Sequence, residues 1–433
     1  MPETTSSRDV ILREEDFLPR LRAASRTLGG WLLHIVAEPA VLDSPGTLTR
    51  FAEEAHRLET FIDDVGGRQN RSFVTFGELL ASVRGLALVK ATGGHVISRL
   101  SRYGLPDRVD LMSLESELRR ADRFLHAGLL ALMQALHRES INLDMEWASI
   151  GLTVESSVAQ RRLLPRNLDV EDAAHEHHHI AEIAGRFLKI LETSRALDLK
   201  DLRPAEDLKR YVAEYATEER CRWYESAVHN IQSMYDTFVL RTGVEEEHPS
   251  LRGLRAHASV ALHMLEMATG LMHFYQRHEN DIRHEPAAVA ISAVVSKSDV
   301  LDLAVNVCLR QAYLMVEGAS PVIDWVLETF VHEQAVDLSL PEGAVLHARP
   351  LALVVQVARH FGLPLEISLD GETCSGNSLM SLIMLGGKHP RPKAIRARGD
   401  ARMLRDLRLL FESGLGENGH SLPEELAYLR VRA

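Results

Sequence analysis

The chain has 433 residues, of which 45% are hydrophobic and 25% are charged, and its formal net charge is −12. This composition excludes a largely disordered chain, and the acidic balance argues against a nucleic-acid-binding protein. Three well-separated cysteines in no CxxC pair argue against a disulfide framework. Because there is no secretory signal and no run of about 18 apolar residues, we expect a cytoplasmic protein without a membrane span.

A helical region is predicted from residue 16 to residue 332, after a flexible N-terminus at residues 1–15. Apolar residues recur at helical spacing in successive segments that are separated by glycine-rich and polar breaks. Near the end of the region, Ser298 or Asp299 is expected to cap a helix, and Pro321 to begin the next one. No internal repeat is visible, so we expect one or two all-α helical bundles. The main helical segments are residues 48–62, 76–104, 110–139, 168–193, 204–240 and 251–279.

The pattern changes at residue 333, where EQAVDLS alternates as a β-strand. From there to residue 418 the elements run in the order strand, helix, strand, short helix, strand and helix. A turn is expected at Asp370-Gly371, after the second strand. This order predicts a small α+β domain at residues 333–418, followed by a C-terminal tail at residues 419–433.

Within this domain, the segment VLHARPLALVVQVARHF carries the strongest chemical signal. Pro350 suits the first turn of a helix, so His347 lies just before a helix N-terminus. That end presents unpaired backbone N–H groups and the positive end of the helix dipole, which favour a bound anion. Arg349 adds a permanent charge that can contact phosphate oxygens. Because a neutral imidazole is a good nucleophile, the arrangement suits a histidine that accepts and transfers a phosphoryl group. A helix-capping histidine beside a solvated arginine is the simpler alternative.

The same segment resembles the active-site signature of HPr, the histidine-containing phosphocarrier of the phosphoenolpyruvate:sugar phosphotransferase system. The resemblance covers residues 334–417 and implies a domain with an antiparallel sheet covered by helices. It identifies His347 as the phosphorylated histidine, Arg349 as the arginine that contacts the phosphate, and Pro350 as the proline that opens the first helix. The stretch IRARGD is similar to the strand and turn before the last helix of the family.

A second stretch, GNSLMSLIMLGG, resembles the family signature in which a serine begins a short apolar helix. Ser378 matches the serine that a dedicated kinase phosphorylates in some bacteria, and a plain helix N-cap is the other role open to it. The sequence departs from the family at Val345, where glycine is usual, and at Asn377, where lysine is usual. The resemblance also implies a patch that docks on enzyme I, formed by Leu379, Met380 and Ile383.

A histidine-rich stretch, HEHHH, is a weaker candidate for chemistry. In a helix, His175, His179 and Glu182 would share one face and could bind zinc or iron. No second cluster has a matching spacing, so a solvated helix face is the favoured interpretation and no metal site is predicted. The sequence also lacks nucleotide-binding and hydrolase motifs, and no cofactor is expected.

Together these features predict a phosphocarrier or regulatory protein rather than a stand-alone enzyme, with His347 and Arg349 as the catalytic pair. The expected partner is an enzyme I-like phosphoryl donor; the acceptor or regulated protein is not identified, and a homo-oligomer remains open. Residues 341–417 carry 10 Lys and Arg against 8 Asp and Glu, so this part could dock on the more acidic helical region. One alternative is a non-catalytic adaptor with the HPr fold, and the departures from the family pattern at Val345 and Asn377 favour it. The other alternative is a metal-binding helical sensor.

Overall fold

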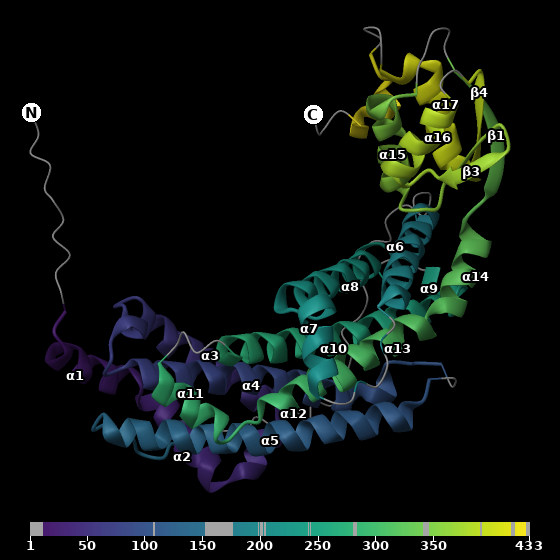
Figure 1. The fold of residues 1–433 in the computed structure, drawn as a ribbon. Helices are drawn as coiled ribbons and strands as arrows, with labels where there is room; N and C mark the ends of the chain where they lie inside the picture. Colours follow the sequence, from purple (N-terminus) through teal and green to yellow (C-terminus); the bar gives the residue numbers. More distant parts are fainter. Residues whose placement is uncertain are drawn as a thin grey trace, which may run out of the picture. The chain divides into compact units, whose positions relative to one another are not determined.

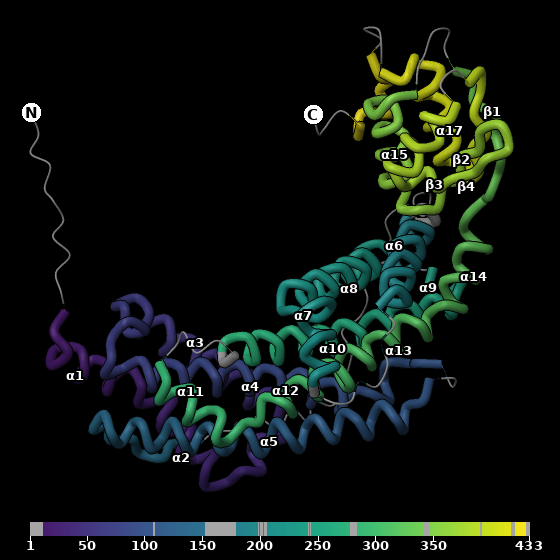
Figure 2. Tube along the Cα trace, in the orientation of Figure 1, coloured from purple at the N-terminus to yellow at the C-terminus, as the bar shows by residue number. Residues whose placement is uncertain are grey.

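A computed structural model gives the fold of the chain (Figures 1 and 2). It describes residues 12–106, 109–151, 176–197, 199, 202, 205–240, 242, 244–279, 284–340, 346–389, 392–416 and 421–429. By their contacts the residues form two compact units. Unit 1 comprises Met1–Pro165, Leu197–Ser226 and Ser259–Met315, and unit 2 comprises Arg166–Ala196, Ala227–Ala258 and Val316–Ala433. Three helices contribute residues to both units: α8 (Glu218–Phe238), α10 (Leu251–Glu279) and α13 (Arg310–Gly318).

Unit 1 is helical, as predicted for this part of the chain. Its central helix is α4 (Val74–Arg99), which packs against both α3 (Pro45–Asp63) and α5 (Leu111–Asn142). Helix α4 buries apolar side chains on several sides, in keeping with its central place. The other elements of the unit are α1 (Glu14–Ala24), α2 (Arg26–Ala37), η1 (Pro39–Asp43), η2 (Gly67–Gln69), η3 (Leu100–Arg102), α7 (Ala205–Tyr215), α11 (Glu285–Ser292), α12 (Lys297–Asp302) and the π-helical η5 (Leu303–Leu309).

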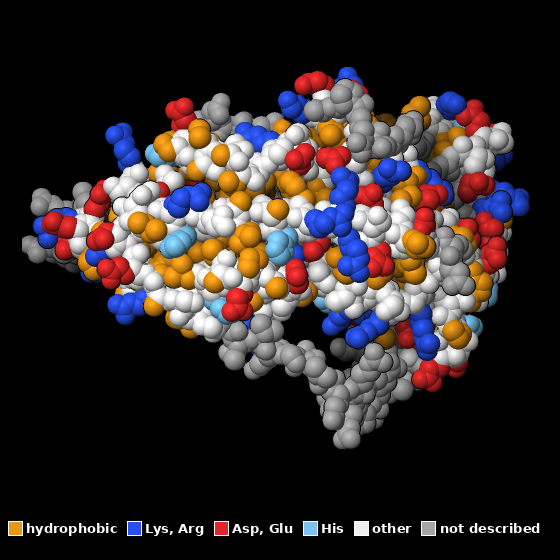
Figure 3. Space-filling model, turned by 90° about the horizontal axis from the view of Figure 1, so that it is seen from below, with side chains coloured by type: hydrophobic (Ala, Val, Ile, Leu, Met, Phe, Trp, Pro, Cys, Tyr) orange, Lys and Arg blue, Asp and Glu red, His pale blue; other side chains and the backbone are white. Residues whose placement is uncertain are grey.

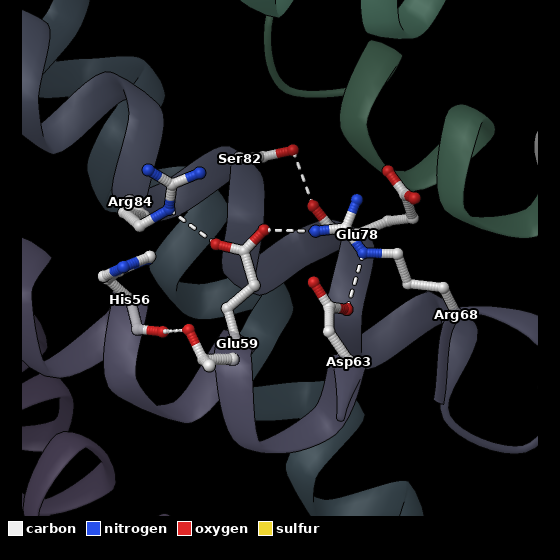
Figure 4. A network of polar contacts seen from close by, with 8 residues as sticks. His56, Glu59, Asp63, Arg68, Glu78, Ser82 and Arg84 are labelled. Carbon is white, nitrogen blue, oxygen red and sulfur yellow. Dashed lines mark hydrogen bonds and ion pairs between the residues drawn. The ribbon is translucent and has the colours of Figure 1, made fainter. Parts of the chain in front are cut away.

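An ion network around the buried carboxylate of Glu59 fastens α3 to α4 in unit 1 (Figure 4). The carboxylate of Glu59 accepts hydrogen bonds from Arg68 and from Arg84, each at 2.6 Å. Arg68 also donates to Asp63 at 2.6 Å. Because a buried carboxylate is costly unless nearby cations compensate its charge, the two arginines explain how Glu59 can lie in the core. The network thus has a structural role, holding the turn η2 between the two long helices.

Two helix boundaries in unit 1 depend on capping hydroxyls. The 204–240 segment forms two helices, because Thr217 accepts a backbone N–H of the first turn of α8 at 3.3 Å and so starts a new helix there. The cap predicted for α12 is wrong: Ser296, rather than Ser298 or Asp299, is the N-cap residue. The Ser296 hydroxyl accepts the backbone N–H of Asp299 at 3.3 Å.

Unit 2 contains two helices that pack against each other, α6 (Glu176–Ala196) and α14 (Ser320–Phe330). Pro321 lies in the first turn of α14, as predicted. Of the helix predicted at residues 168–193, residues 168–175 lie outside the described part of the chain. The Tyr235 hydroxyl donates to the Glu245 carboxylate at 2.7 Å and ties α8 to the short helix α9 (Val244–Glu247).

The C-terminal elements of unit 2 form a four-stranded antiparallel sheet in the order β1-β4-β2-β3. Val336 on β1 lies opposite Ala397 on β4. The predicted turn joins β2 to β3, with positive φ values of 48° at Asp370 and 89° at Gly371, as a tight hairpin turn requires. Strand β3 itself was not predicted. The strands are β1 (Glu333–Ser339), β2 (Glu366–Leu369), β3 (Glu372–Ser375) and β4 (Ala394–Asp400).

Helices α15 (Ala348–Phe361), α16 (Leu379–Lys388) and α17 (Ala401–Glu412) lie together on one side of this sheet (Figure 1). The predicted α+β fold, with an antiparallel sheet covered by helices, is therefore confirmed. The domain limits at residues 333 and 418 stay a prediction. The core between the layers is formed by apolar side chains that include Leu338, Val354, Ile367, Leu369, Ile395, Met403, Leu407 and Leu410.

Asp400 anchors the end of α14 to the sheet. It is 1% exposed, and its carboxylate accepts hydrogen bonds from the backbone N–H and Nε of Arg402, at 2.9 and 2.8 Å, and from the N–H of His332 at 3.3 Å. Arg402 also donates to the carbonyl oxygen of Phe330, the last residue of α14, at 3.3 Å. Burial would raise the pKa of Asp400, but the hydrogen bonds and charge of Arg402 outweigh that effect and hold this pKa below its usual value.

The segment after α17 packs back on the domain. In η7 (Glu424–Leu429), Leu426 is fully buried, and the Tyr428 ring stacks on His360 with 3.8 Å between ring centroids. The Tyr428 hydroxyl donates to Asp406 at 2.9 Å, and burial together with this carboxylate raises the pKa of Tyr428. The region predicted as a C-terminal tail therefore contains an element that covers the core beside α15 and α17.

The surface seen from below mixes hydrophobic side chains with charged side chains and histidines (Figure 3). Among the most exposed large hydrophobic residues of unit 1 are Met112, Val289 and Ile141. In the part of the chain that the structure describes, no helix has both the length and the apolar character needed to cross a membrane.

Candidate functional site

His347 occupies the N-cap position of α15. Its backbone is extended, with φ −114° and ψ 179°, and its Nδ1 atom accepts the backbone N–H of Arg349 at 3.4 Å. In a neutral imidazole, the nitrogen that accepts a hydrogen bond bears the lone pair, and the other nitrogen carries the proton. Nδ1 is therefore the nitrogen that can form a bond to an electrophile. The His347 side chain is exposed, so another protein can reach it.

The first turn of α15 places positive potential beside this imidazole. The first backbone N–H groups of a helix have no acceptor within the helix, and one of them, that of Arg349, points at Nδ1. Pro350 has no N–H and is buried, which anchors the turn in the domain. The side chain of Arg349 is exposed next to His347. A phosphoryl group on Nδ1 would thus lie at a helix N-terminus with an arginine adjacent, and both favour its negative charge.

Helix α16 supports the chain just before His347 through a close contact. A Cβ atom at Gly386 would lie 3.2 Å from the carbonyl oxygen of Leu346 and 3.8 Å from Cδ1 of Leu351. Glycine therefore allows the backbone of α16 to lie against the residue that precedes the histidine. Val345, where the sequence departs from the HPr pattern, lies outside the described residues, as does the whole stretch 341–345.

Ser378 is the N-cap residue of α16, which is one of the two roles predicted for it. Its hydroxyl oxygen accepts the backbone N–H of Ser381 at 3.3 Å and the hydroxyl of Ser381 at 2.9 Å. The residue is half-buried. Phosphorylation of Ser378 stays a prediction.

The outer face of α16 exposes large apolar side chains. Met380 is 67% exposed, Met384 63% and Ile383 37%, and we call these three residues the α16 patch. Leu379, predicted as part of the docking surface, is half-buried and so is less accessible than the three residues of the patch. Leu382 is buried in the domain. Met384 was missed, although its spacing of four residues from Met380 places both on one helix face. A cluster of exposed, flexible methionines suits contact with another protein.

Asn377 braces the loop before Ser378. Its Oδ1 accepts the N–H of Leu365 at 2.8 Å, and its Nδ2 donates to the carbonyl oxygen of Leu363 at 2.9 Å. A lysine, the usual residue of the family at this position, has no acceptor and could not make the first of these bonds. The departure at Asn377 thus replaces a cation by a structural amide.

The histidine-rich stretch forms no group of three potential metal ligands in the part of the chain that the structure describes. The His179 ring stacks on Phe238 with 3.8 Å between centroids, and its Nδ1 lies 3.8 Å from a Glu182 carboxylate oxygen. That carboxylate also accepts a hydrogen bond from Arg186 at 2.7 Å, so an arginine already neutralises it. His175 lies outside the described residues.

These features define a small α+β domain with a histidine at the N-terminus of its first helix. Residues 333–412 match the family model described as the PTS HPr component phosphorylation site, and the C-terminal region is an HPr-like domain. No family model matches the N-terminal region. No curated protein and no solved structure matches the chain.

Proposed function

We propose that this protein is a phosphocarrier or regulatory protein whose His347 accepts a phosphoryl group from an enzyme I-like donor. The observation that carries the proposal is the N-cap geometry of His347, with Nδ1 facing a first-turn amide of α15. The match of residues 333–412 to the HPr family supports it. The phosphoryl group would then pass to an acceptor, or its presence would be signalled through the helical region. The proposed place of action is the cytoplasm.

In the proposed step, the hydrogen bond from the Arg349 N–H to His347 Nδ1 breaks, and the freed lone pair of Nδ1 attacks the phosphorus atom carried by the donor. The new nitrogen–phosphorus bond forms as the bond between phosphorus and the donor side chain breaks, and the donor side chain keeps that electron pair. The proton on Nε2 does not move. Arg349 and the first-turn amides of α15 stabilise the charge on the phosphoryl oxygens during transfer. The same atoms act in reverse when an acceptor takes the group.

The α16 patch is the proposed docking surface for the donor. Its methionines can adapt their shape to an apolar partner surface. The contact between Gly386 and Leu346 links this helix directly to the chain before His347. A partner seated on α16 would therefore be held next to the imidazole, which is the positioning that phosphoryl transfer needs.

Ser378 is the proposed position of regulatory phosphorylation. A phosphoryl group there would place negative charge at the start of α16, where the helix dipole favours it. The same charge would lie beside the apolar α16 patch and would oppose the docking of an apolar or acidic partner surface. Phosphorylation of Ser378 would thus slow phosphoryl transfer to His347 without unfolding the domain.

The proposal is tested by incubating the full chain with phosphoenolpyruvate and enzyme I and measuring acid-labile phosphate. We expect about one phosphoryl group per chain, as a single acceptor histidine requires. His347→Ala should carry none. The matched control is His360→Gln, which changes an exposed histidine in the last turn of the same helix and should be labelled like the wild type. A wild-type chain that takes up no phosphate would instead identify a non-catalytic adaptor.

A further inference from the structure

A cavity of about 420 Å³ lies between α6 and the HPr-like domain, and all of its lining residues belong to unit 2. Its volume is in the range that holds a small metabolite. Helix α6 forms one wall, and the end of α15 with the loop before α16 forms the other. The polar lining residues are Arg186, Lys189, Glu192, Arg359, Ser375, Asn377 and Ser378.

Two glycines bring these walls together. A Cβ atom on Gly185 of α6 would lie 2.0 Å from the carbonyl oxygen of Gly362, which ends α15 with a φ of 65°. A Cβ atom on Gly362 would lie 3.2 Å from Cγ of Glu182. No other residue allows the α6 backbone to lie this close to the end of α15. The cavity is therefore bounded by a tightly packed contact between the two helices.

The cavity is lined by more positive than negative side chains. Arg186, Lys189 and Arg359 are exposed cations around it, and Glu192 is its one lining carboxylate among the described residues. Glu182 accepts hydrogen bonds from Nε and Nη2 of Arg186, at 3.0 and 2.7 Å, which orients that guanidinium. Cations from two separate helices can contact different oxygens of one anion, which strengthens binding beyond a single ion pair.

The start of α16 adds to this positive potential. Ser378, its N-cap residue, lines the cavity, so the positive end of the dipole of this ten-residue helix lies at the same place. Asn377 provides no charge there, because its side-chain amide is neutral, and that amide is hydrogen-bonded to the backbone of Leu363 and Leu365. The cations of α6 and α15 thus supply positive charge where the HPr pattern would place a lysine.

We propose that this cavity binds a phosphate group, carried either by a phosphorylated small molecule or by Ser378 itself. A phosphate offers several oxygens to Lys189, to Arg359 and to Arg186, whose guanidinium Glu182 orients. A neutral or cationic ligand offers these cations no negative charge. A bound phosphate would join α6 of the helical region to the start of α16, which carries the α16 patch. The inference does not depend on phosphorylation of His347.

The first experiment uses free ligands and the unmodified full chain. Calorimetric titrations at constant ionic strength use inorganic phosphate and glucose 6-phosphate, with glucose as the uncharged control. A free-ligand site binds the two phosphates saturably and does not bind glucose. Lys189→Ala and Arg359→Ala should each weaken binding about tenfold, and Lys189→Arg should retain it. The matched control, Arg408→Ala, removes an exposed arginine of α17 outside the cavity and should leave affinity unchanged.

The second experiment installs phosphoserine at position 378 during translation. If Ser378 supplies the phosphate group, the unmodified chain binds neither free probe, and the phosphoserine chain melts at a higher temperature than the unmodified one. Combining Lys189→Ala with Arg359→Ala should remove that gain, and Arg408→Ala should not. The inference is overturned if neither free phosphate nor phosphoserine gives an effect that depends on Lys189 and Arg359. It is equally overturned if Arg408→Ala reduces the effect as much as they do.

Discussion

Replacing Asp400 by asparagine is expected to loosen the corner where α14 meets the sheet. The carboxylate of Asp400 accepts hydrogen bonds from Arg402 Nε and N–H and from the His332 N–H. Asparagine keeps the shape and can still cap α17, but it removes the charge that pairs with Arg402. Losing charged hydrogen bonds in a buried site costs about 2–3 kcal/mol. Because the Arg402 side chain is 30% exposed and water can solvate it, we expect the lower end, about 2 kcal/mol.

This loss can be measured by hydrogen exchange of the β1 and β4 amides in the full chain. A cost of about 2 kcal/mol corresponds to exchange that is about 30 times faster, where exchange follows opening of the sheet. The matched control is Asp337→Asn on β1, whose carboxylate is 71% exposed and 3.9 Å from Arg396. Such an exposed pair contributes little. If Asp400→Asn accelerated exchange no more than this control, the buried ion pair would not hold the corner together.

The same variant has a defined pH dependence. The pKa of Asp400 lies below its usual value in the folded protein, so its stabilising effect is present above the unfolded-state pKa of about 3.9. The effect is lost as the pH falls through the folded-state pKa. The wild type should therefore be more stable than Asp400→Asn at neutral pH, and the two should converge in strong acid. A difference that stayed constant from neutral to strongly acidic pH would show that the charge of Asp400 is unimportant.

Three further substitutions address the docking helix and the C-terminal element. Met384→Glu should slow phosphoryl transfer from enzyme I at least tenfold, because the apolar contact between the α16 patch and the donor is lost. Thermal stability should not change, since the side chain of Met384 is exposed. An unchanged transfer rate would show that the α16 patch does not dock the donor. Gly386→Val should destabilise the domain by about 1–3 kcal/mol in urea unfolding, because its side chain meets the backbone of Leu346; equal stability would contradict the close contact. Tyr428→Phe should cost about 1 kcal/mol through loss of its bond to Asp406, and an unaltered urea midpoint would count against that bond.

Much of the HPr-like domain could be predicted from local patterns. The alternation in EQAVDLS, the turn residues Asp370 and Gly371 and the proline after His347 each specify their element within a few residues. Strand β3 could not be found this way. Its sequence, ETCS, is only four residues long and has no apolar alternation, and its side chains are mostly exposed. The pairing with β2, rather than any local signal, makes it a strand.

The features that depend on contacts distant in sequence were also not predicted. Gly185 and Gly362 are far apart in the chain, and nothing around either residue indicates that their backbones touch. The cavity beside them is therefore visible only in the folded structure. The same is true of Tyr428, whose hydroxyl and ring find partners on two different helices. Long-range packing, which has no fixed sequence period, accounts for these omissions.

The central claim is that His347 carries a phosphoryl group, and locating that group in the chain tests it most directly. The full chain would be charged with phosphoenolpyruvate and enzyme I, kept at alkaline pH to preserve phosphohistidine, and digested. Fragment masses would then assign the modified residue. The proposed mechanism predicts phosphate on His347 and its complete loss in His347→Ala. A phosphoryl group found on another histidine, or none on any residue, would contradict it.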